Sequence, residues 1–441
     1  MKDLSGWGRY PRVSGQLDAA FDIRPAAKAT AALPGVIARG LGRSYGDAAI
    51  GRNNTLDATG LNRMQGFDPD TGVLATEAGV SLSDIIATFL PRGYFPSCVP
   101  GTRFVTVGGM IASDVHGKNQ HNDGTFGDHV EWLMLALPDH RVVRCSRDEN
   151  AELLRATIGG MGLTGTILSA GFRLKQVETG WIRQNTHVAR NLSEAVALLR
   201  QTGHSTYTVA WIDVLARGAS LGRSLVLEGE HARKDQLPWG DVAFPSSRNG
   251  RIGVPTDMPG WMLNATTVRA FNELYYRNGA RKAGRTVLVP WDAYFFPLDG
   301  VANWNRIYGR RGFVQHQCVI PDAKAESVVS EILERFSSHG AGSFLAVLKR
   351  LAPGSGLMSF PMEGLTLALD IPVSDKLMPL LAEIDALVVE AGGRMYLAKD
   401  ATQSPETFVA GYPQLDRFRR LRDEIGATGQ MASKLSERLG I

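Results

Sequence analysis

The sequence has little cysteine and no long hydrophobic run, and each absence excludes a class of protein. Its three cysteines, Cys98, Cys145 and Cys318, form no CxxC pair and are odd in number. This argues against a disulfide scaffold or a structural zinc site and favours a reducing compartment. No apolar stretch reaches the roughly 18–20 residues that cross a bilayer, and the first eight residues lack the apolar segment of a secretory signal. We therefore expect a cytoplasmic protein that is soluble or peripheral to a membrane.

The chain also has almost no net charge. Lys and Arg number 48 against 44 Asp and Glu, which leaves a net charge of +4 over 441 residues. Nucleic-acid-binding proteins concentrate basic residues on one face, so we expect no nucleic-acid partner. Hydrophobic residues at 44% and charged residues at 21% are typical of globular proteins, which excludes wholesale disorder. The length predicts two or three domains.

Several motifs of common cofactor sites are missing or misplaced. The sequence contains no GxxxxGK[ST] phosphate loop and no HExxH zinc motif. Residues 159–165 contain GxGxxG, but a predicted helix precedes them and a predicted strand follows, the reverse of the order in a dinucleotide-binding site. His116, His121 and His129 lie within fourteen residues, yet their spacing matches no ligand pattern. We expect neither NAD nor a metal ion.

Two glycine-rich segments carry the positive evidence. One covers residues 38–47, and the other begins at residue 100 and runs to residue 119. Each combines glycines with hydroxyl side chains and a basic residue. Glycines allow successive backbone N–H groups to point into one concavity, which favours anions. Two such loops that converge would hold a pyrophosphate without a lysine or a metal ion; the alternative is that both are structural turns.

The pattern of apolar residues and turn signals changes along the chain. Short strands alternate with short helices up to about residue 178, with helices expected at 83–89 and 148–157 and a strand at 164–176. Further on we expect a second, sheet-based domain with helices on one face. Its strands are expected at 206–214, 223–229, 285–296, 313–320, 343–349 and 364–371, and its helices at 193–201, 322–338 and 374–391; residues 405–439 are also expected to be helical.

The order of the motifs is similar to that of one enzyme family. Residues 39–44 fit RGxGxS, residues 100–109 fit PGxxxxTVGG, and His116-Gly117 follows. Together they resemble the FAD-binding loops of the vanillyl-alcohol-oxidase-like flavoprotein superfamily. The resemblance covers nearly the whole chain and is greatest to the members that oxidise a polyprenylphosphoryl-β-D-ribose. It continues through residues 159–165, 312–317 and 396–400.

This resemblance implies an α+β fold. In the superfamily, FAD lies between two α+β subdomains, and a cap domain built on an antiparallel sheet with helices covers the isoalloxazine ring. We expect the FAD-binding domain at residues 1–178 and the cap, or substrate, domain at 179–393. A C-terminal segment at 394–441 is expected to return to the FAD-binding domain.

The family's FAD contacts carry over to matching positions of this chain. A bulky Cβ at the glycines among them would hold phosphate oxygens away from backbone donors. Many members bond the flavin covalently through a histidine that is Arg43 here, and some add a cysteine where residues 103–105 contain none. We therefore expect non-covalent FAD. The residues expected to bind it are Arg39, Gly40, Leu41, Gly42, Arg43, Ser44, Tyr45, Gly46, Gly101, Thr106, Val107, Gly108, Gly109, Ser113, Asp114, Val115, His116, Gly117, Ile167 and Tyr396.

Other matching positions imply the catalytic residues. The resemblance puts Lys399 and Lys118 near the flavin, where a cation favours the negative charge of the reduced ring. The alternative for a lone lysine is a solvated surface charge. Tyr45 and His116 are the other catalytic candidates.

The resemblance also implies which cap residues face the substrate. Amide and ammonium groups suit sugar hydroxyls and a phosphate. Ala368 stands where mycobacterial-type members have a cysteine, so thiol-directed inhibition should not carry over. The substrate contacts are expected from Trp211, Gln315, Gln317 and Lys349.

The implied activity is oxidation of the C2′ hydroxyl of a polyprenylphosphoryl-β-D-ribose to a ketone. A separate short-chain reductase would complete an epimerisation to the arabinose form, which serves the cell envelope. One alternative is an FAD-dependent oxidase of a soluble sugar, polyol or aldonolactone. Another, from a different class, is a flavin-free binding protein that keeps the scaffold.

Residues 275–285 are basic and include aromatics. One interpretation is a solvated loop. The other is contact with anionic lipid head groups, worth roughly 1 kcal/mol per basic residue near a charged surface. A lipid-linked substrate favours the second, and we expect a peripheral position at the inner membrane.

Overall fold

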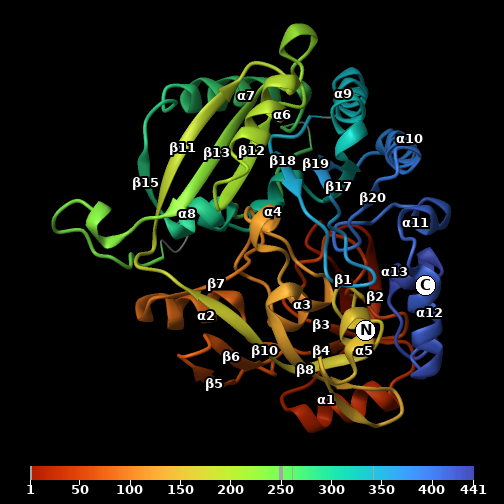
Figure 1. Cartoon of the computed structure of the whole chain (residues 1–441). Coiled ribbons are helices and arrows are strands. Elements are labelled where there is room, and N and C mark those ends of the chain that lie inside the picture. The colour runs from red at the N-terminus through yellow and green to blue at the C-terminus, as the bar shows by residue number, and fades with distance from the viewer. Residues whose placement is uncertain (1, 248–251, 261, 341) are drawn as a thin grey trace.

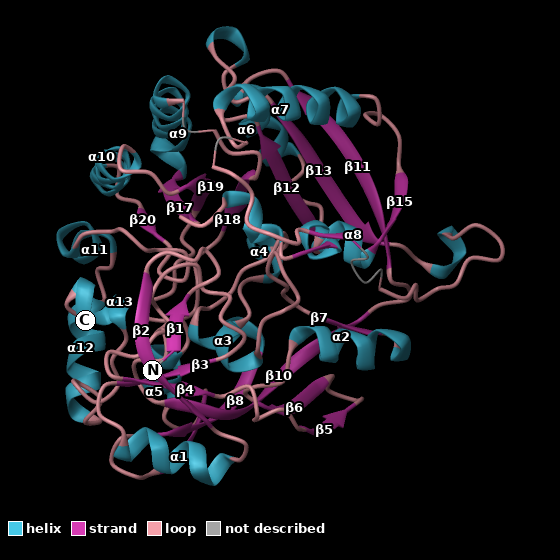
Figure 2. Cartoon of the chain, turned by 180° about the vertical axis from the view of Figure 1, so that it is seen from behind, coloured by secondary structure: helices cyan, strands magenta, loops and turns pink. Residues whose placement is uncertain are grey.

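The computed structural model describes residues 2–247, 252–260, 262–340 and 342–441. Two smaller sheets and their helices form one half of the molecule, and one large sheet forms the other half (Figures 1 and 2). The large sheet comes from residues after 180, as the change in sequence pattern predicts. Within the described ranges, no helix is both long enough and apolar enough to cross a membrane.

The first sheet is built around a parallel β-α-β unit. Strand β4 pairs in parallel with both β2 and β3, and β1 adds to the edge in antiparallel orientation. Asp22 caps helix α1, and its side chain accepts a hydrogen bond from the N–H of Arg24. Its buried Thr30 donates to Thr166 Oγ1 at 2.7 Å, which ties this layer to the second sheet. The elements are β1 (Lys2–Ser5), β2 (Arg12–Ala19), α1 (Ile23–Ala32), β3 (Val36–Arg39) and β4 (Asn54–Asp57).

The second sheet has the order β5-β6-β10-β8-β9, and β7 also pairs with β10. Its central strand β10 is buried along most of its length, and all of its described pairings are antiparallel. Helix α2 packs its apolar face into the core beside this sheet. The strands are β5 (Met64–Asp68), β6 (Val73–Glu77), β7 (Tyr94–Pro96), β8 (Val130–Ala136), β9 (Val142–Ser146) and β10 (Thr166–Gln176); the helices are α2 (Leu82–Phe89), α3 (Val107–Ala112), α4 (Gln120–Asp123) and α5 (Ala151–Thr157).

The large sheet is antiparallel throughout and has the order β15-β11-β13-β12-β18-β19-β17-β20. Three helices cover one face of it and bury an aliphatic core there (Figure 1). This confirms the predicted α+β class with an antiparallel cap sheet and helices. The strands are β11 (Trp181–Ala189), β12 (Tyr207–Ile212), β13 (Ser224–His231), β15 (Val287–Pro290), β17 (Phe313–Pro321), β18 (Ala346–Leu351), β19 (Gly364–Pro372) and β20 (Arg394–Met395), and the covering helices are α6 (Leu192–Gln201), α9 (Asp322–His339) and α10 (Leu377–Glu390).

Two local expectations were wrong. The strand expected at 285–296 ends at Pro290, because helix α8 (Trp291–Phe295) begins directly after it. The basic stretch 275–285 does not form a loop throughout, since helix α7 (Ala265–Ala280) includes its first half. Asn264 caps α7 by accepting from two backbone N–H groups. A short two-stranded pair, β14 (Ile252–Gly253) with β16 (Val301–Ala302), lies nearby in the chain.

The C-terminal segment packs against the N-terminal half. Residues around Met431 pair with Val36: the Val36 N–H donates to Gln430 O at 2.9 Å, and the Ala432 N–H donates to Val36 O at 3.0 Å. Arg438 forms ion pairs with Asp47 and Asp400. The helices are α11 (Pro405–Gly411), α12 (Leu415–Glu424) and α13 (Lys434–Leu439), seen in blue beside β1 and β2 in Figure 1. The division at residues 178 and 393 stays a prediction; β20 still pairs with β17.

Candidate functional site

A cavity of about 420 Å³ lies between the glycine-rich loops and the face of the large sheet opposite α6, α9 and α10. The loops that follow β3 and precede α3 form one wall. Side chains of β12, β13, β17, β18 and β19 form the opposite wall. The two segments singled out in the sequence therefore meet at one place, together with the expected substrate residues.

The first loop needs glycine at two positions. A Cβ on Gly40 would lie 2.2 Å from Thr106 Oγ1, so a side chain there would separate the first loop from the second. Gly42 has φ +64°, a conformation that L residues adopt rarely, and its Cβ would meet the Arg39 guanidinium. The close approach of the loops thus depends on residues that lack side chains.

The second loop is anchored by Thr106 and Val107. Thr106 caps α3 through a hydrogen bond from the Gly109 N–H, and Val107 is fully buried in the core. A Cβ on Gly108 would lie 3.0 Å from the Cβ of Ala78, whereas one on Gly101 would meet no protein atom within 4 Å among the described residues. Gly101 therefore borders open space in the cavity, and Gly108 permits the helix to sit against the sheet.

Four of the residues expected to bind FAD do not line the cavity. Arg39 donates to the backbone oxygens of Ala49 and Ser5, and Asp114 accepts from Gly127 N–H at 3.0 Å and from Ser359 Oγ. Gly46 packs against the backbone of Asp400, and Val107 points into the core. These four support the loops from behind. The other expected FAD, substrate and catalytic residues all line the cavity.

The cavity contains buried polar atoms that lack a protein partner, which fits a polar cofactor. Arg43 Nε and His116 Nδ1 have none among the described residues. Gln317 Nε2 lies 3.0 Å from His116 Nε2, and an amide nitrogen only donates, so the proton of this histidine is on Nδ1. Burial and the cations of Lys349 and Lys399 lower the pKa of His116 well below its ordinary value, which keeps the ring neutral. His116 Nδ1–H is thus a donor available to a bound flavin.

Three lysines from different parts of the chain converge on the cavity. Burial lowers the pKa of Lys118 to about 7 and that of Lys349 to about 8, and repulsion from Lys349 adds to the shift at Lys118. Burial also lowers the pKa of Lys399 to about 8, which Asp370 opposes. Lys118 Nζ donates to Tyr294 O, and Lys399 Nζ lies 3.9 Å from the centroid of the Tyr45 ring. Such a group of cations favours an anionic ligand.

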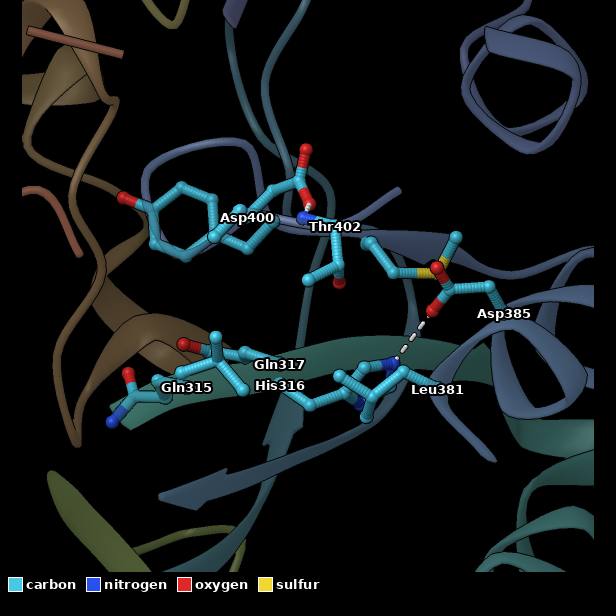
Figure 3. Close-up of a pocket in the computed structure, with 11 residues that line it drawn as sticks. Gln315, His316, Gln317, Leu381, Asp385, Asp400 and Thr402 are labelled. Carbon is cyan, nitrogen blue, oxygen red and sulfur yellow. Dashed lines mark hydrogen bonds and ion pairs between the residues drawn. The ribbon is translucent and has the colours of Figure 1, made fainter. Parts of the chain in front are cut away.

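Strand β17 points alternate side chains to opposite faces of the large sheet. Gln315 and Gln317 face the cavity, whereas His316 points the other way and meets Asp385 of α10 at 2.8 Å (Figure 3). Burial lowers the pKa of His316, but the hydrogen bond and charge of Asp385, with a contribution from Cys318, outweigh it and raise this pKa to about 10. The small space that Figure 3 shows beside it, about 10 Å³, has room for a water and not for a substrate.

The glutamine amides present their oxygens to the cavity. Gln317 Nε2 faces His116 and also donates to Thr366 Oγ1 at 3.2 Å, and Gln315 Nε2 donates to Asp370 Oδ1. With both nitrogens held by protein groups, the amide oxygens are the groups that can accept from hydroxyls, and the Gln315 side chain also interacts with the Tyr45 hydroxyl.

One part of the cavity wall is apolar. The ring centroid of Trp211 lies 4.8 Å from that of Tyr275, which comes from α7, and Trp211 Nε1 donates to Phe344 O at 3.2 Å. Successive side chains of a strand point to opposite faces of the sheet, so only alternate residues of β12, β13 and β18 can line the cavity. The apolar members are Val209, Trp211, Leu227, Tyr275, Leu345 and Val347.

Sequence reasoning missed two carboxylates of this site. Asp299 accepts from Thr102 Oγ1 at 2.7 Å and from the Arg103 N–H at 2.9 Å, which fastens the cap to the second loop. Asp370 is the one charged residue of the apolar strand β19, and this isolation was the signal available. Among the described residues no cluster of three or more His, Cys, Asp or Glu could hold a metal ion.

Comparisons with known proteins agree with this geometry. Residues 24–146 match the family described as FAD binding domain. The chain is 36% identical to decaprenylphosphoryl-beta-D-ribose oxidase of Mycolicibacterium smegmatis over 99% of this chain and 97% of that protein. It is 33% identical to an uncharacterized protein of Streptomyces coelicolor over 82% of this chain and all of that protein. L-gulonolactone oxidase of Mus musculus is 29% identical over 30% of this chain and 29% of its own length. The chain is an FAD-dependent oxidoreductase of the vanillyl-alcohol-oxidase-like superfamily and belongs to the family of decaprenylphosphoryl-beta-D-ribose oxidase.

Proposed function

We propose that this enzyme oxidises the C2′ hydroxyl of a polyprenylphosphoryl-β-D-ribose to the 2-keto sugar. One observation carries the proposal: a single cavity combines amide acceptors, three lysines and an apolar wall. These match the hydroxyls, the phosphate and the lipid of such a substrate. The near full-length similarity to decaprenylphosphoryl-beta-D-ribose oxidase supports the same substrate class.

The residues divide the work by their chemistry. Bound FAD supplies the two-electron oxidant. The glycine-rich loops hold its pyrophosphate, and His116 donates from Nδ1. Lys399 favours negative charge that develops in the site. The amide oxygens of Gln315 and Gln317 accept hydrogen bonds from sugar hydroxyls and fix the ring.

Lys118 and Lys349 are proposed to bind the substrate phosphate. Lys118 lies in the second loop and Lys349 in β18, both line the cavity, and among the described residues neither forms an ion pair with a carboxylate. A phosphate would offset their mutual repulsion. The apolar residues that follow along β12, β13 and β18 would then contact the first isoprene units.

A soluble sugar, polyol or aldonolactone is the second candidate. The similarity to L-gulonolactone oxidase motivates it, but that similarity covers only 30% of this chain. The apolar wall formed by Trp211 and its neighbours has no use in a site for a small polar substrate. The lipid-linked sugar therefore explains more of the cavity.

Anaerobic mixing tests the choice of substrate. The FAD-loaded enzyme is mixed with polyprenylphosphoryl-ribose, with free ribose and ribose 5-phosphate, and with an aldonolactone, and the flavin absorbance is followed. We expect rapid bleaching with the lipid-linked ribose alone. Bleaching by the lactone or free sugar at equal or greater rate would contradict the proposal.

We also propose that FAD is bound without a covalent link. The position that carries a histidine in many family members is Arg43, whose guanidinium lies 3.8 Å from the centroid of the Trp7 ring and cannot form a flavin bond. Acid denaturation of the yellow protein should release all of the flavin into the supernatant. Flavin that precipitates with the chain would contradict this.

The outer surface of α7 supports a peripheral membrane contact. Phe271 and Leu274 are 45% and 70% exposed, and the basic residues Arg277, Arg281 and Lys282 follow in the chain. Tyr275 on the same helix lines the cavity, so a lipid chain would pass directly from a bilayer to the site. Flotation with anionic and neutral vesicles tests the membrane contact, which predicts binding to the anionic vesicles only.

A short-chain reductase that consumes the ketone is proposed as the functional partner.

A further inference from the structure

Asp370 is a buried carboxylate that faces the cavity and has no role in the assignments above. It is the one charged residue among the nine of β19, and its relative exposure is 1%. It lies on the same face of the strand as Ala368, and both line the cavity. A carboxylate in such a position costs free energy, so it requires compensating contacts.

Only one oxygen of Asp370 is occupied by protein. Gln315 lies directly opposite on β17, and its Nε2 donates to Asp370 Oδ1. The backbone N–H of Asp370 is held by Ser343 Oγ and Leu345 O. No described residue donates to Oδ2. The strand register thus fixes the carboxylate and leaves one oxygen for a ligand.

The groups that face Asp370 set its charge. Burial raises its pKa to about 7, while the hydrogen bond from Gln315 and the Lys399 ammonium act in the opposite direction. The hydroxyls of Tyr45 and Tyr308 are the other titratable groups near it, and the pKa of each is raised well above its ordinary value, so both stay neutral. Asp370 and Lys399 are therefore the ionisable pair of this part of the cavity.

We infer that Asp370 is the catalytic base that removes the proton of the reacting hydroxyl, an inference that rests on the proposed function. The O–H bond breaks, its proton goes to Asp370 Oδ2, and its electron pair forms the carbonyl. The hydrogen on the same carbon leaves with two electrons, which FAD accepts when bound. A base whose proton affinity lies near the working pH is suited to this role.

The other candidates are less suited to accept this proton. His116 Nε2 already accepts from Gln317, and Nδ1 carries a proton, so the ring offers no free lone pair. Tyr45 is a neutral phenol. Lys118 donates to Tyr294 O. Lys399 is the last candidate, but its ammonium is needed to balance negative charge in the cavity.

The electrostatic attraction between Asp370 and Lys399, which form no direct ion pair, keeps the buried charge constant. Before the reaction the carboxylate balances the Lys399 ammonium. Once Asp370 holds the proton, the Lys399 ammonium is free to balance the negative charge that a bound flavin would gain. No net charge is created in a low-dielectric cavity, which lowers the cost of the step.

Asp370→Asn tests the inference, with Asp385→Asn as the matched control. Both remove a buried carboxylate from the cap, but Asp385 faces away from the cavity and pairs with His316. Asp370→Asn should keep FAD and reduce the rate constant of anaerobic flavin reduction by about a hundredfold or more at saturating substrate. Its pH–rate profile should lose the rise across about pH 7. Asp385→Asn should stay within about threefold of wild type and keep that rise.

A second measurement needs no catalysis. Difference infrared titration of the FAD-loaded protein without substrate should show a carboxyl group that deprotonates near pH 7 in wild type and in Asp385→Asn. The signal should be missing in Asp370→Asn. If no carboxyl of the wild-type protein titrates between pH 6 and 8, the inference is overturned, even if the variant fails to fold.

The outcomes separate this inference from the proposed function. If the wild type oxidises a different alcohol and not the lipid-linked ribose, the proposed substrate is wrong, and Asp370→Asn is tested with that alcohol. If Asp370→Asn reduces its flavin within threefold of wild type between pH 6 and 9, Asp370 is not the base, whatever the substrate.

Discussion

The two walls of the cavity are built in different ways. The wall made by residues 38–47 and 100–119 consists of loops whose backbones approach one another where side chains are absent. The opposite wall consists of strands that present side chains to the cavity at alternate positions, among them Gln315, Lys349 and Trp211. The first wall, the loop wall, suits a large cofactor that backbone groups hold. The second, the strand wall, suits a substrate that side chains recognise.

This difference predicts how each wall responds to mutation. A new side chain in the loops obstructs cofactor binding and removes everything that depends on it. A lost side chain in the strands leaves the cofactor in place and changes the rate, the affinity or the choice of substrate.

Gly40→Val should have the largest effect. Its Cβ would lie 2.2 Å from Thr106 Oγ1, so the two loops would move apart and FAD content should fall below about a tenth of wild type. The absorbance of the purified protein measures this. Gly66→Ala in β5 is the control, because its Cβ would meet nothing within 4 Å. A Gly40→Val protein that stays yellow and active would show that the loops do not need this close approach.

Lys399→Ala should keep much of its FAD and lose rate. Its ammonium lies beside Tyr45 in the cavity and favours negative charge that forms during the reaction, so its loss acts on the transition state more than on substrate binding. Removal of one such group typically costs about a hundredfold or more in rate. Stopped-flow flavin reduction at saturating substrate measures it, with Lys399→Arg expected to recover part of the loss. A rate within about threefold of wild type would remove Lys399 from the mechanism.

The sequence predicted the loop wall better than the strand wall, and the reason is physical. Close backbone approach requires glycine at fixed spacing, and that requirement is visible in residues 39–44 and 100–109. The same stretches also include Arg39 at the end of β3 and Val107 at the start of α3, whose side chains point away from the cavity. They support the loop instead.

The strand wall depends on register, which is not local in the sequence. Gln315 and Asp370 are 55 residues apart and meet because β17 and β19 pair in one particular alignment. The resemblance supplied Gln315 and Ala368 but not Asp370, two positions further along the same face. Helix α7 was not predicted either. Its cap is the single residue Asn264, and the segment after it mixes apolar and basic residues, which obscures the helical pattern.

Substrate affinity should depend on pH through Lys349 of the strand wall and Lys118 of the second loop. Burial lowers the pKa of Lys118 to about 7 and of Lys349 to about 8, so both cations are present at pH 6 and lose their protons as pH rises through these values. A phosphodiester keeps its charge over this range. We expect a lipid-phosphoryl 2-deoxyribose, which lacks the reacting hydroxyl, to bind about tenfold more weakly at pH 9 than at pH 6, since a charge-assisted hydrogen bond is worth about 1.5–3 kcal/mol. Titration of the flavin spectrum measures this, and Lys349→Met should flatten the curve; an unchanged slope in that variant would assign the effect elsewhere.

Trp211→Ala should have the smallest effect and the most selective one. Trp211 is buried against Tyr275 in the apolar part of the strand wall, two strands away from the strand that carries Asp370. Its loss removes apolar contact with the lipid and leaves the chemistry intact, so the KM for a long polyprenyl substrate should rise about fivefold while kcat changes little. A short-chain analogue that does not reach this part of the cavity should be used equally well by both proteins, and Trp211→Phe should retain most of the affinity. If long and short substrates lose affinity alike, Trp211 contacts the sugar and not the lipid, and the apolar part of the strand wall is not the lipid site.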